Sequence, residues 1–302
     1  MASRAHARLF GVLGDPVDHS LSPAMQNAAF AAAGLPHLYL RYRVPPAELP
    51  QALREARALG MGGLNLTVPL KEVALPLVDA LTPEARRIGA VNTIVFDARS
   101  GRTLGDNTDG RGFLAALGGR VRLRGATAVL VGAGGSARAV GCALVAAGVG
   151  RIVVANRTRA RATRLAADLS GGGTCDVTAV PLAALARGDA LTGAALVVNT
   201  TPLGLRGGSL HVRWAATPRR CLAVDLVYAP RLTPFLAAAA RAGRPVMDGG
   251  PMLLHQGALA FEAWTRRRAP RDAMARSLRA SGLALTGLGR AGTIRAHRPP
   301  TS

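Results

Sequence analysis

The chain has 302 residues, a length that suggests about two domains. Its hydrophobic residues (49%) outnumber its charged residues (18%), so the composition excludes a chain that is disordered throughout. Lysine and arginine together number 38, yet Lys71 is the only lysine. An arginine keeps its proton near neutral pH, whereas a lysine ammonium is able to release one. Lys71 is therefore the first candidate for acid–base chemistry, and a chance survivor of an arginine-biased composition is the alternative.

The same numbers limit the possible partners and the location. No apolar run approaches the ~18 residues of a membrane span, and the amino terminus lacks the apolar segment of a signal peptide. The cysteines Cys142, Cys175 and Cys221 are far apart, so we expect no disulfide framework, no metal site and a cytoplasmic location. A net charge of +21 is compatible with nucleic-acid binding, but the arginines are dispersed and aromatic residues make up only 4%. We therefore expect a small-molecule substrate, and neither nucleic acid nor a membrane.

Segments with strand and helix patterns alternate from the amino terminus, which is typical of an α/β fold with mostly parallel strands. The first helix is expected to begin with Ser22 as its N-cap, to have Pro23 at its first helical position, and to stop at Gly34. Around it, the first unit is predicted to contain strands at 9–13, 38–44 and 63–67, a helix at 46–59, and a short hairpin at 92–96 and 103–104.

A second unit begins near Leu123 and repeats the strand–helix–strand pattern through Asp225. Its first strand, 126–131, continues directly into Gly132, Ala133, Gly134, Gly135, Ser136 and Ala137. This G-x-G-x-x-A pattern between a strand and a helix favours a dinucleotide-binding turn over a plain tight turn. The glycines allow the backbone to turn sharply and approach a pyrophosphate, and the start of the helix offers free N–H groups.

The end of the next strand, 151–155, indicates which dinucleotide binds. An enzyme that uses NAD usually has an acidic residue there, which holds the ribose 2′-hydroxyl. This chain has Asn156, Arg157, Thr158 and Arg161 and no acid, so the sequence favours NADP. A solvated helix start that is rich in arginine by composition is the alternative, but it leaves the missing acid unexplained.

Three polar motifs of the first unit lie where strands are expected to end and helices to begin, which is where ligands collect in parallel α/β sheets. They span residues 19–23, 65–72 and 105–110. Ordinary helix caps and turn chemistry are the alternative for each motif taken alone. Together the motifs offer hydroxyls, amides, one ammonium and one carboxylate, a set that suits a small acid with several hydroxyl groups.

The chain resembles the shikimate dehydrogenase family from about Leu9 to Trp264. The resemblance is carried by HSLSP (19–23), NLTVPLKE (65–72), AVNT (90–93), GDNTDG (105–110), GAGGSAR (132–138), NRTxxRA (156–162) and GxxMLLHQ (249–256), in the order and spacing of the family. It implies a two-domain α/β enzyme that reduces 3-dehydroshikimate to shikimate with NADPH in aromatic amino-acid biosynthesis. The implied substrate domain is 1–112, completed by C-terminal helices at 250–289. The implied Rossmann-type NADP domain is 113–249, and 290–302 is a loose tail.

The resemblance also implies a role for individual residues. Lys71 is implied to be the catalytic acid–base group, with Asp109 paired to it. Substrate contacts are implied for Ser20, Ser22 and Tyr228 (carboxylate) and for Asn65, Thr67, Asn92 and Gln256 (hydroxyls, or the position of Lys71). Cofactor contacts are implied for Gly132, Ala133, Gly134, Gly135 and Ser136 (pyrophosphate), Asn156, Arg157, Thr158 and Arg161 (2′-phosphate), and Leu226 and Gly249 (nicotinamide side).

Two positions depart from the family pattern. Pro83 stands where many members have a polar residue that reaches the cofactor, and Gly250-Pro251 stands where a Leu-Gly pair is common.

A quinate/shikimate dehydrogenase that uses NAD, or an aminoshikimate paralogue, is the nearest alternative function. A basic nucleic-acid-binding protein with a Rossmann-like fold is the alternative from a different class. The sequence leaves open whether the protein is a monomer or a homodimer.

Overall fold

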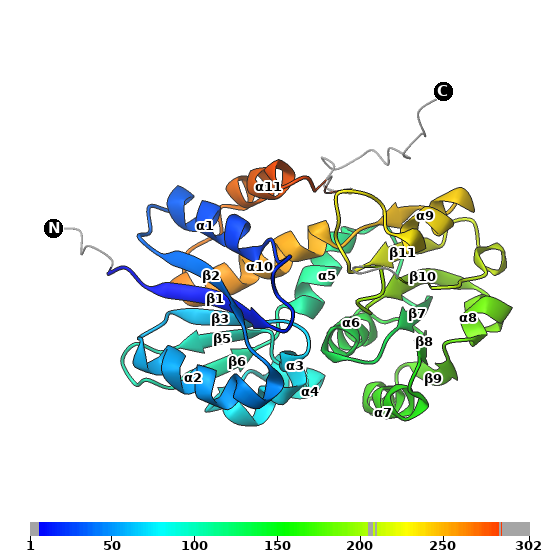
Figure 1. Cartoon of the computed structure of the whole chain (residues 1–302). Helices are drawn as coiled ribbons and strands as arrows, with labels where there is room; N and C mark the ends of the chain where they lie inside the picture. Colours follow the sequence, from blue (N-terminus) through cyan, green and yellow to red (C-terminus); the bar gives the residue numbers. More distant parts are fainter. Residues whose placement is uncertain (1–5, 205–207, 209, 284, 286–302) are drawn as a thin grey trace. The chain divides into compact units, whose positions relative to one another are not determined.

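A computed structural model describes residues 6–204, 208, 210–283 and 285. These residues form two compact units: the described parts of 1–115 with 133–146 and 252–282, and the described parts of 116–132, 147–251 and 283–302. Each unit is described by itself below, with the element labels of Figure 1. The functional boundaries expected at 112 and 249 stay predictions, and the expected tail at 290–302 lies outside the described residues.

The first sheet is mixed, with the strand order β2-β1-β3-β5-β6-β4. Its strands are β1 (Leu9–Gly14), β2 (Leu38–Arg43), β3 (Gly63–Leu66), β4 (Ala80–Leu81), β5 (Thr93–Phe96) and β6 (Thr103–Asp106). Strand β5 is antiparallel to both β3 and β6, and the other pairings are parallel. The strands β1, β3 and β6 therefore all end at the same edge of the sheet, and β5 begins there.

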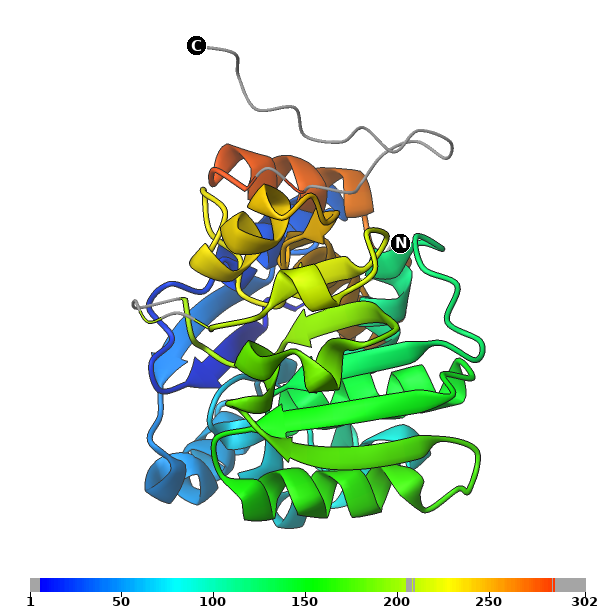
Figure 2. The same ribbon diagram turned by 90° about the vertical axis from the view of Figure 1, so that its right-hand side faces the viewer.

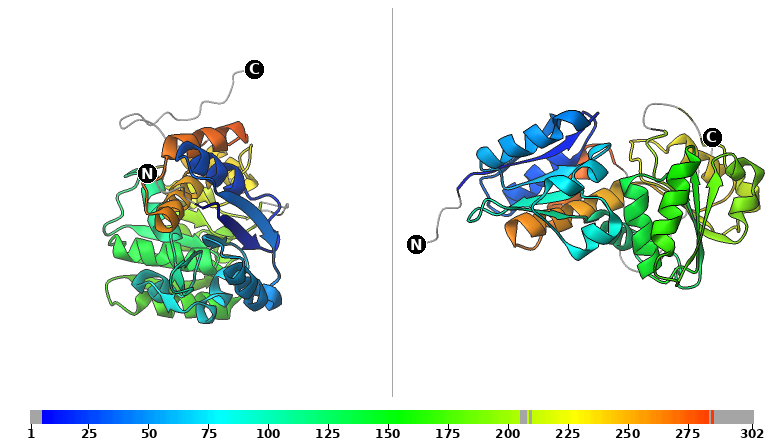
Figure 3. Two further views of the ribbon diagram at one scale, coloured as in Figure 1. Left: turned by 90° about the vertical axis from the view of Figure 1, so that its left-hand side faces the viewer. Right: turned by 90° about the horizontal axis from the view of Figure 1, so that it is seen from below.

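The first unit contains several helices, some of which pack on each face of its sheet. They are α1 (Ser22–Ala32), α2 (Leu49–Ala58), α3 (Leu70–Val73), α4 (Pro83–Ile88), α5 (Asp109–Leu117), α6 (Gly135–Ala146), α10 (Gly250–Thr265) and α11 (Arg271–Ala280), with short 3₁₀ turns η1 (Pro46–Glu48) and η2 (Leu75–Leu77). On one face, the Phe10 ring stacks 4.9 Å from that of Phe30 and 5.3 Å from that of Trp264. On the other, Leu13 and Leu64 share a buried cluster with α2. Figure 3 (left) shows α1 and α11 side by side.

The start of α1 differs from the expectation for Ser22. The N-cap is Leu21, and Ser22 is already the first helical residue, with Pro23 following it. Proline is tolerated throughout the first turn because the N–H groups there have no intrahelical partner. The backbone N–H of Ser22 donates instead to the Ser20 hydroxyl at 3.3 Å. The Ser20 hydroxyl therefore accepts a hydrogen bond from the Ser22 backbone N–H, one of the donors at the start of α1 that have no partner within the helix.

The second sheet is entirely parallel, with the strand order β12-β11-β10-β7-β8-β9. Its strands are β7 (Thr127–Val131), β8 (Arg151–Asn156), β9 (Asp176–Pro181), β10 (Ala194–Asn199), β11 (Leu222–Asp225) and β12 (Val246–Met247). Its helices are α7 (Arg159–Ser170), α8 (Ala184–Arg187) and α9 (Pro234–Arg241), with 3₁₀ turns η3 (Asp189–Leu191) and η4 (Trp214–Ala216). Figure 2 shows these strands side by side, with α7 next to β8 and β9.

The order of this second sheet matches that of a dinucleotide-binding Rossmann domain, in which the strand order reverses between the first and fourth strands. Here the reversal falls between β7 and β10. The side chains of Val129, Leu130 and Val131 in β7 are all fully buried, as expected for a central parallel strand with helices on both faces. The two-domain α/β fold expected from the sequence is confirmed.

A close approach of two helices fixes the position of α5 against α10. A Cβ atom at Gly112 would lie 2.7 Å from both the backbone nitrogen and the Cβ of Gln256. Because the neighbouring atoms are backbone atoms or lie next to the backbone, a rotamer change alone cannot relieve this contact. Glycine at this position therefore lets α5 carry Asp109 while α10 carries Gln256 close by.

We expect Gly112→Ala to lower the free energy of unfolding by about 1–3 kcal/mol, the usual cost of overpacking. The loss should appear although alanine favours a helix over glycine by about 1 kcal/mol. Urea denaturation measures it, and Gly172→Ala is the control because a Cβ there would meet nothing within 4 Å. Equal stability of the two variants would contradict the close approach.

Candidate active site

The polar residues of the first unit meet at the edge where β1, β3 and β6 end. Register places Asn65 of β3 opposite Thr93 of β5, and Thr93 opposite Asp106 of β6. Paired residues point to the same face of a sheet, so this row brings side chains from distant motifs together. Asn92 lies directly before β5, at the same edge. The register of the strands is therefore sufficient to bring these polar side chains together.

A buried hydrogen-bond network holds Asn65 and Asn92. The Tyr39 hydroxyl donates to Asn65 Oδ1 at 2.8 Å, and Asn65 Nδ2 donates to Thr93 Oγ1 and to the Asn92 carbonyl, both at 3.1 Å. The Thr93 hydroxyl in turn donates to Asn92 Oδ1 at 2.8 Å, and the backbone N–H of Thr108 donates to the same oxygen at 2.8 Å. The two amides thus have fixed orientations.

Asp109 connects this network to the lysine. Asn92 Nδ2 donates to Asp109 Oδ1 at 2.7 Å, while Lys71 Nζ lies 2.6 Å from Asp109 Oδ2. The side chains of Lys71 and Asp109 are only 12% and 5% exposed. Lys71 Nζ also donates to Ser136 Oγ at 3.1 Å. The sole lysine is therefore a largely buried ammonium whose charge is balanced by a carboxylate.

The local chain path explains why Lys71 lies here. The backbone N–H of Thr67 donates to the Leu13 carbonyl at 2.9 Å, which holds the end of β3 against β1. Lys71 follows in the short helix α3, and its carbonyl accepts a hydrogen bond of 2.7 Å from Val91 N, next to Asn92. A Cβ at Gly135 would approach the Lys71 Cβ to 2.9 Å. The backbone around Lys71 is therefore fixed from both sides.

Three further residues of the first unit that are predicted to bind the substrate lie around the same edge. Ser20 and Ser22 are buried in the connection from β1 to α1, and half-buried Thr67 follows β3. Gln256, in α10, joins the network because its Oε1 lies 3.5 Å from Asn92 Nδ2, while its Nε2 donates to the Leu253 carbonyl at 2.9 Å. The first unit thus joins Asn65, Asn92, Asp109, Lys71 and Gln256 in one connected set of hydrogen bonds.

The glycine turn has the geometry that the sequence predicts. Gly132 has a φ of +114°, and a Cβ there would lie 2.4 Å from Thr200 Oγ1. Gly132 therefore has to be glycine on two grounds, its left-handed backbone and the lack of space. Ala133 and Gly134 follow, and α6 begins at Gly135 with Ser136 in its first turn. The first N–H groups of such a helix have no intrahelical partner and suit a phosphate.

The residues predicted to bind the 2′-phosphate lie at the end of β8. Asn156 ends the strand and donates from Nδ2 to the Thr158 carbonyl at 2.9 Å. Thr158 is the N-cap of α7, yet its side chain makes no capping hydrogen bond, and the first turn of α7 has no acidic residue. Arg157, Thr158 and Arg161 are exposed. An anion at this helix start would meet positive charge and open N–H groups.

The remaining predicted residues, Leu226, Tyr228 and Gly249, lie in the second unit. Leu226 and Tyr228 follow β11 directly and are half-buried, and Gly249 follows β12.

The two departures from the family pattern are ordinary helix starts. Pro83 follows the N-cap Thr82 of α4, whose hydroxyl accepts from Ala85 N at 3.1 Å, and Pro251 is in the first turn of α10.

Sequence reasoning missed the residues that support the network from behind. Tyr39 lies on β2 and gives no motif signal, and its role follows only from the strand order, in which β1 alone separates β2 from β3. Thr93 and Thr108 stand inside recognised motifs, AVNT and GDNTDG, but their part as hydrogen-bond partners of Asn92 follows only from the structure.

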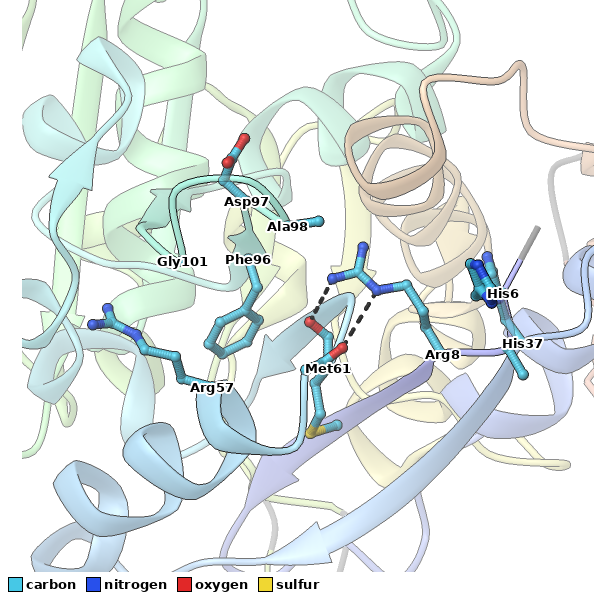
Figure 4. Close-up of a pocket in the computed structure, with 11 residues that line it drawn as sticks. His6, Arg8, His37, Arg57, Met61, Phe96, Asp97, Ala98 and Gly101 are labelled. Carbon is cyan, nitrogen blue, oxygen red and sulfur yellow. Dashed lines mark hydrogen bonds between the residues drawn. The ribbon is translucent and has the colours of Figure 1, made fainter. Parts of the chain in front are cut away.

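A cavity of about 600 Å³ opens at the opposite edge of the first sheet, where Phe96 ends β5 (Figure 4). Figure 4 shows Phe96 between Arg57 and Arg8. Arg8 uses its guanidinium to donate to the Gly60 carbonyl at 3.3 Å and the Met61 carbonyl at 3.2 Å. None of the predicted site residues lines this cavity, so it is separate from the candidate active site.

The described residues contain neither a candidate metal cluster nor a candidate membrane span. Among residues 6–204, 208, 210–283 and 285, no group of three or more His, Cys, Asp or Glu side chains is placed to hold a metal ion. Within the same ranges, no helix has both the length and the apolar character needed to cross a membrane.

Comparison with protein-family models identifies three consecutive segments of the chain. Residues 12–94 match the shikimate dehydrogenase substrate binding domain, residues 116–200 match shikimate / quinate 5-dehydrogenase, and residues 251–279 match the shikimate 5′-dehydrogenase C-terminal domain. Among curated proteins, the chain is 47% identical over 278 residues to the NADP(+) shikimate dehydrogenase of Symbiobacterium thermophilum, covering 90% of this chain and 94% of that protein.

Solved structures agree with this result. The shikimate 5-dehydrogenase of Thermus thermophilus, in complex with NADP(H) and shikimate, is 43% identical with a TM-score of 0.78 and covers 91% of this chain and 99% of its own. The quinate dehydrogenase of Corynebacterium glutamicum, in complex with NAD, is 34% identical with a TM-score of 0.80 and covers 91% of this chain and 100% of its own.

Two threonine-to-valine changes test the network and should have opposite effects. Thr93→Val removes a hydroxyl that bonds both Asn65 and Asn92, so we expect the free energy of unfolding to fall by about 1–3 kcal/mol. Thr178→Val is the matched control, because Thr178 Oγ1 is buried and has no partner in the described part of the chain. It should leave stability unchanged or raise it, and urea denaturation of both variants makes the comparison. Equal losses would contradict the network.

Proposed function

We propose that this chain, which belongs to the shikimate dehydrogenase family, catalyses the reversible reduction of 3-dehydroshikimate to shikimate with NADPH in aromatic amino-acid biosynthesis. The observation that carries the proposal is the buried Lys71–Asp109 pair, with 2.6 Å between Nζ and Oδ2, at the edge where β1, β3 and β6 end. The 47% identity to an NADP(+) shikimate dehydrogenase over 90% of the chain supports the same reaction.

Features of the second unit support NADP as the cofactor. The left-handed, unsubstitutable Gly132 allows the backbone to turn toward a pyrophosphate. The exposed Arg157 and Arg161, with the uncapped start of α7, suit the 2′-phosphate that distinguishes NADP from NAD. Leu226 and Gly249 are proposed to line the nicotinamide side. When bound, the nicotinamide supplies or accepts the hydride.

Lys71 is proposed to carry the proton of the reaction. As the ketone carbon gains a hydride, its oxygen gains negative charge, which an adjacent ammonium stabilises and then neutralises with a proton. Asp109 keeps Nζ in place until transfer, with 2.6 Å between Nζ and Oδ2. In the reverse direction, the neutral amine accepts the proton of the shikimate hydroxyl. Ser136, 3.1 Å from Nζ, fixes the lysine from its other side.

The other polar residues are proposed to bind the substrate. Ser20 and Ser22 are small hydroxyl donors in the connection after β1 and suit the carboxylate, with Tyr228 as a third donor. The proposed partners of the ring hydroxyls are Asn65, Thr67, Asn92 and Gln256. The amides of Asn65 and Asn92 are held by hydrogen bonds on more than one side, so their orientations are fixed.

We also propose the functional division into a substrate domain, 1–112 with 250–289, and an NADP domain, 113–249. The matches of 12–94 to a substrate binding domain model and of 251–279 to a C-terminal domain model support it. A reducing cytoplasm is the proposed location, supported by Cys142, Cys175 and Cys221, none of which forms a disulfide in the described part of the chain.

Quinate oxidation with NAD is the second candidate function. It is favoured by the likeness to the quinate dehydrogenase of Corynebacterium glutamicum in complex with NAD. The missing acid after β8 and the two exposed arginines argue against NAD. Initial rates with shikimate or quinate, each with NADP or NAD, separate the candidates. We expect the shikimate–NADP pair to have the highest kcat/KM, and a higher value for quinate–NAD would overturn the first proposal.

Replacing Lys71 should remove the chemical step. We expect Lys71→Ala to lower kcat by about 10²–10⁴-fold, the usual contribution of a general acid, with a smaller change in NADPH affinity. Lys71→Arg should fail as well, because a guanidinium holds its proton too tightly. Initial rates of NADPH oxidation with 3-dehydroshikimate measure kcat, and NADPH fluorescence measures binding. A kcat equal to that of the unmodified protein in either variant would contradict the role.

The cofactor preference should depend on Arg157. We expect Arg157→Ala to raise the KM for NADP roughly 10–100-fold, since a charged hydrogen bond contributes about 1.5–3 kcal/mol, while the KM for NAD changes little. Arg220→Ala is the matched control, because this exposed arginine precedes β11 at the opposite edge of the second sheet. Equal changes for NADP and NAD, or an effect of Arg220→Ala, would count against 2′-phosphate recognition.

A further inference from the structure

Three connections leave the second sheet at one edge, after β10, β11 and β12. Asn199 is the last residue of β10 and Asp225 the last of β11, and the two are paired in register. The connection after β11 carries Leu226 and Tyr228, and the connection after β12 carries Gly249. These are the residues proposed to face the nicotinamide and the substrate carboxylate, but Asp225 itself has no role assigned so far.

The Asp225 carboxylate is the centre where the first two connections are joined. Its Oδ1 accepts hydrogen bonds from Asn199 Nδ2 at 2.9 Å and from the Val227 N–H at 3.1 Å. Its Oδ2 accepts from the Thr233 hydroxyl at 2.6 Å, at the start of α9. Asp225 thus bonds the strand before it, the loop after it and the helix that follows.

The loop held in this way is tightly packed on its other side. The Leu226 N–H donates to the Asn199 carbonyl at 2.9 Å, and the Gly249 N–H donates to the Val227 carbonyl at 3.3 Å. A Cβ at Gly249 would lie 2.1 Å from the Leu226 carbonyl oxygen. Residues 226 and 227 are therefore confined between the end of β10 and the connection after β12.

The chain keeps this carboxylate although its burial is unfavourable. Asp225 has no exposed surface, and burial raises the pKa of its carboxyl to about 6, with a smaller contribution from the negative charge of Asp248. Among the described residues, no lysine or arginine forms an ion pair with Asp225, so its hydrogen bonds alone offset the loss of water. A carboxyl whose pKa is shifted this far is a candidate for a functional position.

We propose that Asp225 is a positioning residue that fixes Leu226, Val227 and Gly249 so that the nicotinamide is held in the orientation required for hydride transfer. This inference rests on the proposed function. Asp225 is proposed to act on the nicotinamide end of the cofactor, whereas Arg157 and Arg161, after β8, are proposed to hold the adenosine end. The two effects are therefore measured separately.

Asp225→Asn tests the claim, because it keeps the shape and removes the charge that accepts three hydrogen bonds. We expect kcat to fall at least tenfold and the KM for NADPH to rise, while the Kd for 2′,5′-ADP stays within twofold of the unmodified protein. This probe carries only the adenosine half with its 2′-phosphate. Asp176→Asn is the control, because Asp176 is an exposed residue at the other end of the same sheet, and it should change none of these values.

Thr233 supplies a second, graded test. Thr233→Val removes the hydroxyl that donates to Asp225 Oδ2, whereas Thr233→Ser keeps it. We expect the valine variant to show the kinetic defect of Asp225→Asn and the serine variant to retain most of the activity. The hydroxyl also caps α9 by accepting from Leu236 N at 3.3 Å, so thermal unfolding is recorded for both variants.

The outcomes separate the two claims. Absence of NADPH oxidation with 3-dehydroshikimate in the unmodified protein would refute the proposed function. An active unmodified protein with unchanged kcat and KM in Asp225→Asn would refute the positioning role alone. A loss of 2′,5′-ADP affinity as large as the loss of NADPH affinity would also refute it, because it would reveal a general loss of structure.

Discussion

A buried ammonium needs a counter-charge in a fixed place, and this requirement organises the first unit. Lys71 is 12% exposed and lies 2.6 Å from Asp109, whose other oxygen is bonded to Asn92. Removing one member of such a pair leaves a buried charge without a partner, and this lowers the free energy of unfolding strongly. The hydrogen bonds from Thr93 and Thr108 to Asn92 therefore support the lysine, and not only the asparagine, by setting the position of its carboxylate.

The polar residues at the strand ends are held in place differently in the two units. In the first, side chains at one sheet edge satisfy one another, and the hydrophobic contacts of Phe10 and Leu13 on opposite faces keep the strands in register. In the second, close backbone packing adds to the side-chain hydrogen bonds of Asp225, because a Cβ at Gly132 or Gly249 would collide with its neighbours. Most of the arginines have no role assigned in either unit, so most of the net charge of +21 is not explained by a ligand.

Much of this structure could be predicted because its signals are local. Strands with continuous apolar runs and the glycines after β7 predict the fold, and polar motifs at strand ends predict which side chains the first sheet brings together. The supporting role of Tyr39 could not be predicted, because it depends on pairing between β1 and its neighbours. The expectation that Ser22 caps α1 is wrong, because the backbone path makes Leu21 the N-cap and Ser22 the first helical residue. The residue roles stay predictions.

The central claim is that the reaction needs a transferable proton at the position of the Lys71 ammonium. Chemical rescue of Lys71→Ala tests it most directly, with NADPH oxidation followed as methylammonium is added, and guanidinium as the charge-matched control that holds its proton. The account predicts that turnover rises with methylammonium concentration and that guanidinium restores none. Equal rescue by both cations would mean that positive charge alone suffices, and would contradict the account.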